Sequence, residues 1–314
     1  MDISYNSFKK QVLDNLVSHL KNQFPDTSAI IPGLWPRHHV TREHILKIEN
    51  GQMNAIKDYN LLKSVMTLPF LLSEKQLHQY AHHLNSSQIM CYNFFRPQLD
   101  GEANVQNPLI NLLKVLVGNF YCDEDKPKAC FEYVDKSSEE PKRKTNFDFF
   151  VEDGTTKIYF EIKYTENGFG TCDYGEKTKE NDKTENPHKT KFDNYYRGKM
   201  EKCGLFRQNV IEWNKTFCNY YQLIRNAINV DEYSFVVIIT DKRNASTNNQ
   251  IESFKTNMLN ESAPYLSHLI FKTWQEMLEL AHENDFSDKH MSEFREKYLK
   301  SKDETKNSFR FSRG

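Results

Sequence analysis

The sequence lacks the features that would place the protein in a membrane or outside the cell. No apolar run approaches the roughly 20 residues that a bilayer span needs, and mean hydropathy is −0.76 with 27% charged residues. Residues 1–6 show no basic stretch followed by an apolar one, as a secretory signal would. The six cysteines include no Cys-x-x-Cys pair, so neither a zinc site nor a disulfide framework is indicated. We therefore expect a cytoplasmic protein with no membrane partner.

The chain also has no excess of positive charge, no internal repeat and no low-complexity tract. Its 42 Lys and Arg residues meet 43 Asp and Glu residues, giving a formal charge of −1. A nucleic-acid-binding protein needs only a local positive surface, so this balance does not exclude one. With 22 Phe and 16 Tyr, the 314 residues are enough for one large domain or two modest ones.

The stretch 145–165 predicts two β-strands joined by a tight turn. Both halves are rich in aromatic and β-branched residues that alternate with polar ones, which is typical of half-buried strands. Asp153 and Gly154, between the halves, tolerate the positive φ angles that hairpin loops require. A two-residue loop at Gly154 and Thr155, or one residue earlier, puts the same apolar side chains on one face. They are Phe147, Phe149, Val151, Ile158, Phe160 and Ile162.

The other face of this hairpin collects charged side chains. With the loop at Gly154 and Thr155, Asp148 lies directly across from Glu161, and Lys163 follows two residues along the same strand. A three-residue loop would turn one strand over and separate the carboxylates, but the apolar pattern argues against it. We predict that all three charged groups emerge together.

Such a set has the chemistry of metal-assisted phosphodiester hydrolysis. Two adjacent carboxylates repel unless a cation lies between them, and oxygen ligands suit Mg²⁺, which keeps several waters and also binds phosphate oxygens. A lysine beside the ion can hold an attacking water and offset charge on the phosphate. The alternative is a surface hairpin whose solvated face carries Asp, Glu and Lys, and the hairpin alone leaves both open.

Asp148 followed by Glu161-Ile162-Lys163 after a hairpin resembles the PD-(D/E)XK signature of the restriction-endonuclease-like nuclease superfamily. Phe147 stands where Pro often precedes the Asp. Other acid-x-Lys triplets at 124–126, 140–142 and 304–306 do not lie in an alternating apolar strand. The resemblance implies that Asp148 and Glu161 bind Mg²⁺, with Mn²⁺ able to substitute and the main-chain carbonyl of Ile162 joining them. It also implies that Lys163 assists the nucleophilic water.

The order of elements supports the same resemblance. A helix from about residue 85, a strand at 128–134, the hairpin, a helix at 205–228 and a continuously apolar strand at 233–240 follow the superfamily's αβββαβ core. We therefore predict an α/β fold with a mixed central sheet flanked by helices, plus an N-terminal helical elaboration. The expected ranges are 1–80 for the elaboration, 81–285 for the nuclease core and 286–314 for a C-terminal helix and polar tail. Within the elaboration, helices are expected at 6–24, 40–50, 57–66 and from 74 to 84.

Further site residues are suggested by position in this core. In the superfamily, the helix after the third strand often presents Gln, Arg, Lys or Tyr to the scissile phosphate or the metal-bound water. Gln222 and Arg225 share a helix face apart from the apolar stripe, so we include both as catalytic candidates, with an ordinary helix surface as the alternative. The run around them, with Gly168-Phe169-Gly170, is similar to a bacterial branch of these nucleases. Weaker candidates are Glu102, the lysines of the polar segment 165–194, and Arg310 and Arg313.

These observations predict a Mg²⁺-dependent endonuclease acting on nucleic acid, with DNA favoured over RNA and a role in restriction, phage defence or repair. Two alternatives remain. One is an RNase or a partner-activated nuclease with the N-terminal helices as a sensor, and the other is a catalytically inactive scaffold of the same fold. A homodimer is also left open.

Overall fold

The computed structural model describes residues 4–35, 37–101, 104–118, 120, 127–134, 145–172 and 187–300. Within them, seven strands form one sheet in the order β3-β4-β5-β6-β7-β8-β9. The strands are β3 (Leu99–Asp100), β4 (Asn104–Val105), β5 (Lys128–Val134), β6 (Asn146–Glu152), β7 (Lys157–Ile162), β8 (Ser234–Thr240) and β9 (Leu269–Thr273). β3 to β7 pair antiparallel, whereas β7, β8 and β9 run parallel. The predicted mixed α/β fold is confirmed.

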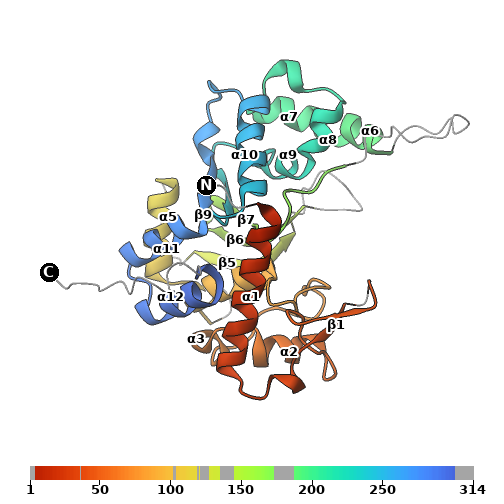
Figure 1. Ribbon diagram of the computed structural model, residues 1–314. Coiled ribbons are helices and arrows are strands. Elements are labelled where there is room, and N and C mark those ends of the chain that lie inside the picture. Colours follow the sequence, from red (N-terminus) through yellow and green to blue (C-terminus); the bar gives the residue numbers. More distant parts are fainter. Residues whose placement is uncertain are drawn as a thin grey trace, which may run out of the picture.

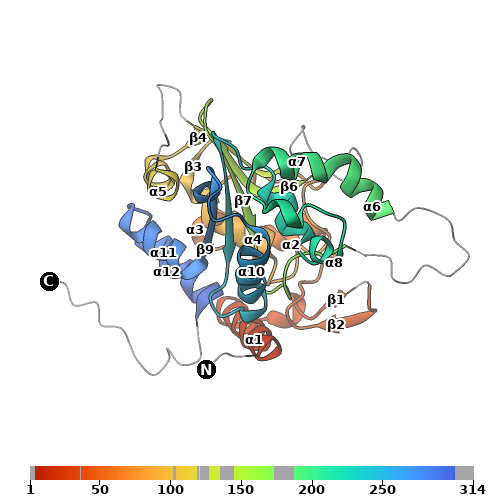
Figure 2. The same ribbon diagram turned by 90° about the horizontal axis from the view of Figure 1, so that it is seen from above.

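Helices cover both faces of this sheet (Figures 1 and 2). On one side lie α1, α4, α5, α11 and α12, and their apolar residues form one cluster with that sheet face. On the other side lie the segments from α6 to α10, which form a second cluster with the opposite face. The helices are α1 (Tyr5–Gln23), α2 (Gln52–Tyr59), α3 (Lys63–Met66), α4 (Ser87–Phe95), α5 (Asn107–Val117), α6 (Pro187–Lys191), α7 (Arg197–Cys203), α8 (Lys215–Asn219), α9 (Tyr221–Ala227), α10 (Ala245–Met258), α11 (Trp274–Glu283) and α12 (Asp288–Phe294). Two π-helical segments, Phe192–Tyr196 and Arg295–Leu299, follow α6 and α12.

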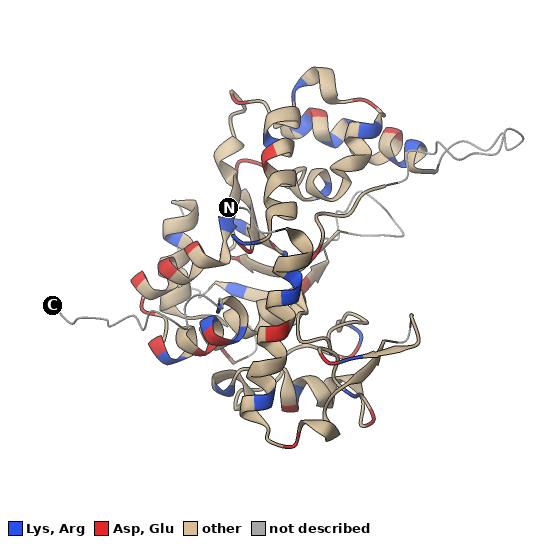
Figure 3. Ribbon diagram, viewed as in Figure 1, with Lys and Arg blue, Asp and Glu red and all other residues tan. Residues whose placement is uncertain are grey.

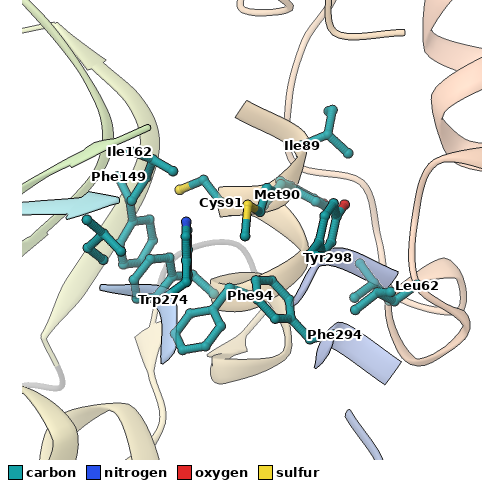
Figure 4. Close-up of a cluster of buried hydrophobic side chains, with 14 of the residues drawn as sticks. Leu62, Ile89, Met90, Cys91, Phe94, Phe149, Ile162, Trp274, Phe294 and Tyr298 are labelled. Carbon is teal, nitrogen blue, oxygen red and sulfur yellow. The ribbon is translucent and has the colours of Figure 1, made fainter. Parts of the chain in front are cut away.

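The helix predicted from about residue 85 is α4, which precedes β3 and which Ser86 caps by accepting the N–H of Ile89. Every residue of α4 after Ser87 is buried because the helix lies between the sheet and α12. Figure 4 shows Met90 and Phe94 of α4 among Phe149 of the sheet, Trp274 and Phe294. β8 is buried along its whole length, as its continuously apolar sequence predicts.

The hairpin adopts the predicted register. Phe149 pairs with Phe160 and Val151 with Ile158, and the N–H of Asp153 bonds the carbonyl of Thr156 at 3.2 Å, so Gly154 and Thr155 form the loop. Gly154 has φ 94°, in the region that favours glycine.

One part of the hairpin prediction is wrong. Five of the six apolar side chains lie in the cluster of α1 and α4, but Phe147 lies in the opposite cluster, against Tyr159. The β5–β6 ladder has no pair between Phe131↔Phe149 and Tyr133↔Phe147, and Glu132 at that point has φ 54°. This local distortion breaks the strict alternation on which the prediction relied.

Two further expectations about helices are wrong. Residues 40–50 contain β2 (Val40–Arg42), which pairs with β1 (Gly33–Trp35), and residues 74–84 form turns. In this second segment, Gln88 of α4 accepts the N–H of His78 and donates to the carbonyl of Gln76. A side chain thus satisfies backbone groups that a helix would have paired internally.

The helix predicted over 205–228 is shorter. It begins only after Asn214, whose side chain caps α8, and Tyr220 separates α8 from α9. In the segment before α8, Phe206 forms an antiparallel β-bridge with Leu259, so the chain at Phe206 is extended where it lies against the end of α10. Among the described residues, no helix has the length and apolar character required to cross a membrane.

Candidate active site

The site begins where β6 and β7 stop pairing through their main chains. Beyond Phe149↔Phe160, Asp148 Oδ2 accepts the N–H of Ile162 at 2.6 Å. On its other edge β7 continues in register with β8, with Glu161 beside Ile238. A side chain therefore takes the place of a strand carbonyl, which fixes the Asp148 carboxylate next to the Glu161-Ile162-Lys163 segment.

Glu161 is the centre of a bonded group of side chains. Its Oε1 accepts from Lys163 Nζ at 2.7 Å and from Gln222 Nε2 at 2.7 Å. The Glu161 side chain is 5% exposed and that of Lys163 is 12% exposed. Burial by itself would lower the pKa of Lys163, but the carboxylates of Glu161, Glu166 and Asp148 raise it above its usual value. The neighbouring carboxylates therefore favour the protonated, cationic form of Lys163.

Glu132 on β5 adds a third carboxylate that the sequence interpretation missed. Asn146 and Gln88 both hydrogen-bond to it. Burial, with a further contribution from Glu161, raises the pKa of Glu132 to about 7. The available signal was a charged residue inside the strand 128–134, whereas the further acid suggested by the sequence, Glu102, lies outside the described residues.

Glu161 and Glu132 both affect the pKa of Asp148. Burial raises its pKa well above the usual range, and the charges of Glu161 and Glu132 raise it further, against an opposing effect from Lys163. Three carboxylates and one ammonium thus share a small region, and the group carries excess negative charge when all are ionised.

The site opens into a cleft of about 560 Å³. Asp148, Lys163, Glu132 and Asn146 line it, together with Thr165 and Glu166 just after β7. The rest of the lining comes mainly from α1, the segment 78–83 and the start of α4. The residues from there are Tyr5, Lys9, His78, Tyr80, His83, Asn85, Ser86, Ser87 and Gln88. Of the predicted site residues, Asp148 and Lys163 therefore face this space, whereas Glu161 and Gln222 are not among the described residues that line it.

Gln222 reaches the site because the chain after β7 folds back onto α9. Its Oε1 accepts the N–H of Gly170 at 2.8 Å, and its own N–H bonds the Gly170 carbonyl at 3.0 Å. Gly168 has φ 105°, and a Cβ there would lie 2.5 Å from the side-chain oxygen of Gln250. The segment Gly168-Phe169-Gly170 therefore forms a tight turn, and this turn positions Gln222 beside Glu161.

Arg225 takes a different position from Gln222. It is buried, donates to Thr145 Oγ1 at 3.3 Å, and lies 5.5 Å from the ring centre of Tyr221. It is not one of the described residues that line the cleft. The structure thus brings Gln222 to the carboxylates and places Arg225 beside the start of β6.

Several predicted contributors lie outside the described residues. They are Glu102, Lys177, Lys179, Lys183, Arg310 and Arg313. Lys189, from the same polar segment, is described and pairs with Asp193 at 2.6 Å. Ile162 is buried with its N–H on Asp148, and the role of its carbonyl stays a prediction.

The donor set suits a hard divalent cation. Among the described residues, no three His, Cys, Asp or Glu side chains are placed to hold one ion together. A site using two carboxylates, with water or main-chain oxygens completing it, is the arrangement that Mg²⁺ commonly accepts. A cation there would relieve the mutual repulsion that raises the pKa of Asp148.

The αβββαβ core, with Asp148 on its second strand and Glu161-x-Lys163 at the end of its third, defines a restriction-endonuclease-like protein. In agreement, residues 37–299 match the family model REase-ARP, described as "Restriction Endonuclease associating with ARP". The chain belongs to this family, and membership indicates a nuclease. No curated protein and no solved structure matches the chain.

Proposed function

We propose that this protein hydrolyses phosphodiester bonds of DNA with the help of Mg²⁺. The observation that carries the proposal is the convergence of Asp148, Glu161 and Lys163, which are bonded to one another directly or through Ile162 beside an open cleft. A solvated surface hairpin would not require two carboxylates to be largely removed from water, since isolated buried charge is unfavourable.

Each residue has a distinct role in the proposed reaction. Asp148 and Glu161 would hold the ion, with the Ile162 carbonyl as a further ligand, and Mn²⁺ would substitute. The bound ion would supply Lewis-acid activation of water and phosphate. Lys163, kept protonated by its neighbours, would donate hydrogen bonds that orient the water and offset charge developing on the phosphate. Gln222 would position Glu161.

A second groove supports a nucleic-acid substrate. It has a volume of about 830 Å³, follows α1, and shares Lys9 with the cleft. Its charged lining residues are Lys9, Lys10, Asp14, Lys21, Glu43 and Lys300. Figure 3 shows basic and acidic residues both present on α1. The lysines exceed the acids in this lining, which gives a locally positive path leading away from the cleft despite the balanced overall charge.

The family description also names an association with ARP. We propose that a partner modulates the activity, in a restriction or phage-defence setting. This agrees with the partner-activated alternative, and it means that the chain alone and the chain with its partner should both be tested.

The direct test incubates the full chain with supercoiled plasmid, single-stranded DNA or RNA, in the presence of Mg²⁺, Mn²⁺ or EDTA, and measures cleavage of each substrate. Cleavage of DNA should require the ion and fall at least about a thousandfold in Lys163→Ala, the order seen when a catalytic group is removed. Lys157→Ala, on an exposed position of the same strand, is the matched control and should retain activity.

Three outcomes would change the proposal. Equal cleavage by Lys163→Ala would show that the activity comes from elsewhere. Cleavage confined to RNA would select the RNase alternative. Binding without cleavage under every ion, with and without a partner, would favour the inactive scaffold.

A further inference from the structure

Aromatic rings form part of the lining of the cleft. Tyr5, His78, Tyr80 and His83 all line the same space as Asp148 and Lys163. We call these four residues the aromatic wall. His78 is exposed and Tyr80 is half-buried, so part of each side chain is accessible to solvent.

The rings of this wall support one another. The ring centres of His78 and Tyr80 lie 5.4 Å apart, and those of Tyr80 and His83 lie 5.1 Å apart. Trp35 packs edge-on behind His83 at 6.2 Å. These spacings are typical of aromatic pairs that hold each other in place.

The wall is also fixed to the catalytic side. Gln88 accepts the N–H of His78 at 3.0 Å, donates to the carbonyl of Gln76 at 2.8 Å, and hydrogen-bonds to Glu132. The side chain of Gln76 donates in turn to the carbonyl of Phe131 at 3.3 Å. The distance between the rings and the carboxylates is therefore set by direct bonds between neighbouring elements.

Burial favours the uncharged form of both histidines in the wall. Burial lowers the pKa of His83 to about 3, with further lowering by the charges of neighbouring histidines, and burial also lowers the pKa of His78. A phosphate-binding surface would use cations, and a base-stacking surface uses neutral ring faces.

We propose that the aromatic wall stacks an unpaired nucleobase adjacent to the scissile phosphate, with His78 and Tyr80 as the contacting rings. The inference rests on the proposed nuclease function and narrows its substrate. Bases inside a duplex have both faces covered by their neighbours, so only a base in a single strand, or one turned out of a duplex, can reach these rings. The protein therefore prefers single-stranded or locally unpaired DNA at the position of cleavage.

The test uses the full chain with Lys163→Ala, which leaves the wall intact and prevents cleavage. It is mixed with single-stranded DNA carrying 2-aminopurine, whose fluorescence is quenched by stacking. We expect strong quenching with the single strand and little with the matching duplex. Adding Tyr80→Ala or His78→Ala should weaken binding about 5- to 100-fold, the range for losing one stacked base, and should relieve the quenching.

Two variants control for folding and for general aromatic effects. Tyr80→Phe keeps a ring and should restore both binding and quenching. Tyr233→Ala removes an exposed tyrosine that does not line the cleft and should change neither. The same probe placed in RNA distinguishes a DNA strand from an RNA strand as the ligand.

The results separate this inference from the proposed function. Quenching that survives Tyr80→Ala and His78→Ala, or that is equal for duplex and single strand, would overturn the stacking subsite even if the wild type cleaves DNA. Wall-dependent quenching without cleavage by the wild type would keep the subsite and reject the nuclease.

Discussion

Gln222 donates from Nε2 to Glu161 Oε1 across 2.7 Å, on the same oxygen that accepts the Lys163 ammonium. Gln222 is itself held by both main-chain groups of Gly170. The carboxylate that would carry the ion is thus oriented by a helix far along the chain, and its second oxygen, Oε2, lies outside these two bonds. A fixed orientation of a ligand by its supporting residues commonly decides metal affinity and rate.

Replacing Gln222 should therefore lower catalysis without abolishing it. We expect Gln222→Ala to reduce kcat about 10- to 100-fold and to raise the Mg²⁺ concentration for half-maximal cleavage, as loss of a supporting hydrogen bond does. Steady-state cleavage across a Mg²⁺ titration measures both effects. Gln208→Ala, at an exposed position before α8, is the control. A change in melting temperature with unaltered Mg²⁺ dependence would assign Gln222 a structural role only.

Removing the charge of Glu132 should stabilise the protein in the absence of divalent ions. Its folded-state pKa of about 7 lies above the ordinary value of 4.5, so the folded state binds more protons between these values and loses stability as pH rises through them. The free energy of unfolding of Glu132→Gln should exceed that of wild type by an amount that grows from pH 5 to pH 8. This difference should reach about 1–2 kcal/mol after allowance for partial solvent access.

Urea unfolding in EDTA at several pH values measures this difference. Glu152→Gln, at the exposed end of the neighbouring strand, should show no such trend. Added Mg²⁺ should shrink the advantage, because the ion would offset the same repulsion. A Glu132→Gln protein that is less stable at pH 8 than at pH 5, relative to wild type, would contradict the electrostatic account.

Lys297 gives a pH dependence of the opposite sign. Lys297 is buried, and its ammonium group donates to the main-chain carbonyl and to Oδ1 of Asn60. Burial lowers the pKa of Lys297 from 10.5 to about 7. Between pH 7 and pH 10.5 the unfolded chain binds more protons than the folded one, so the free energy of unfolding rises with pH. Below pH 7 the full cost of burying the charged lysine is present. We expect the stability of Lys297→Met relative to wild type to fall by about 2 kcal/mol between pH 7 and pH 9.5.

The measurement is again the free energy of unfolding in urea. Lys289→Met, exposed on α12, should leave the pH profile unchanged. Parallel pH profiles for wild type and Lys297→Met would mean that this lysine is charged in the folded state throughout the range.

The groove along α1 should determine the salt dependence of binding. Neutralising Lys9, Lys10 and Lys21 together, each to Gln, should lower the slope of log affinity against log salt by about 2, because each lost phosphate contact removes about 0.7–0.9. Filter binding or fluorescence anisotropy with a long oligonucleotide, over a range of salt concentrations, gives this slope.

The control for this prediction is a protein with the same change in net charge. Lys114, Lys272 and Lys289 lie on α5, β9 and α12, away from both the groove and the cleft, and can be changed to Gln together. Equal slopes for the two triple variants would show that only overall charge matters, and would exclude α1 as part of the nucleic-acid-binding surface.

The local sequence was sufficient for the hairpin and for the proximity of Asp148, Glu161 and Lys163. Strand alternation and turn preference act over a few residues, so the register could be obtained without knowing the rest of the fold. The αβββαβ order was predicted for the same reason, since each element has its own apolar period and end signals.

Glu132, the aromatic wall and the position of Arg225 were decided only by the tertiary structure. Glu132 joins the site through a distorted position in β5, and residues 74–84 are held in turns by Gln88 rather than forming a helix. Arg225 shares a helix face with Gln222 in the sequence, yet it lies beside Thr145. These placements depend on hydrogen bonds between segments distant in the chain, and no local periodicity encodes such bonds.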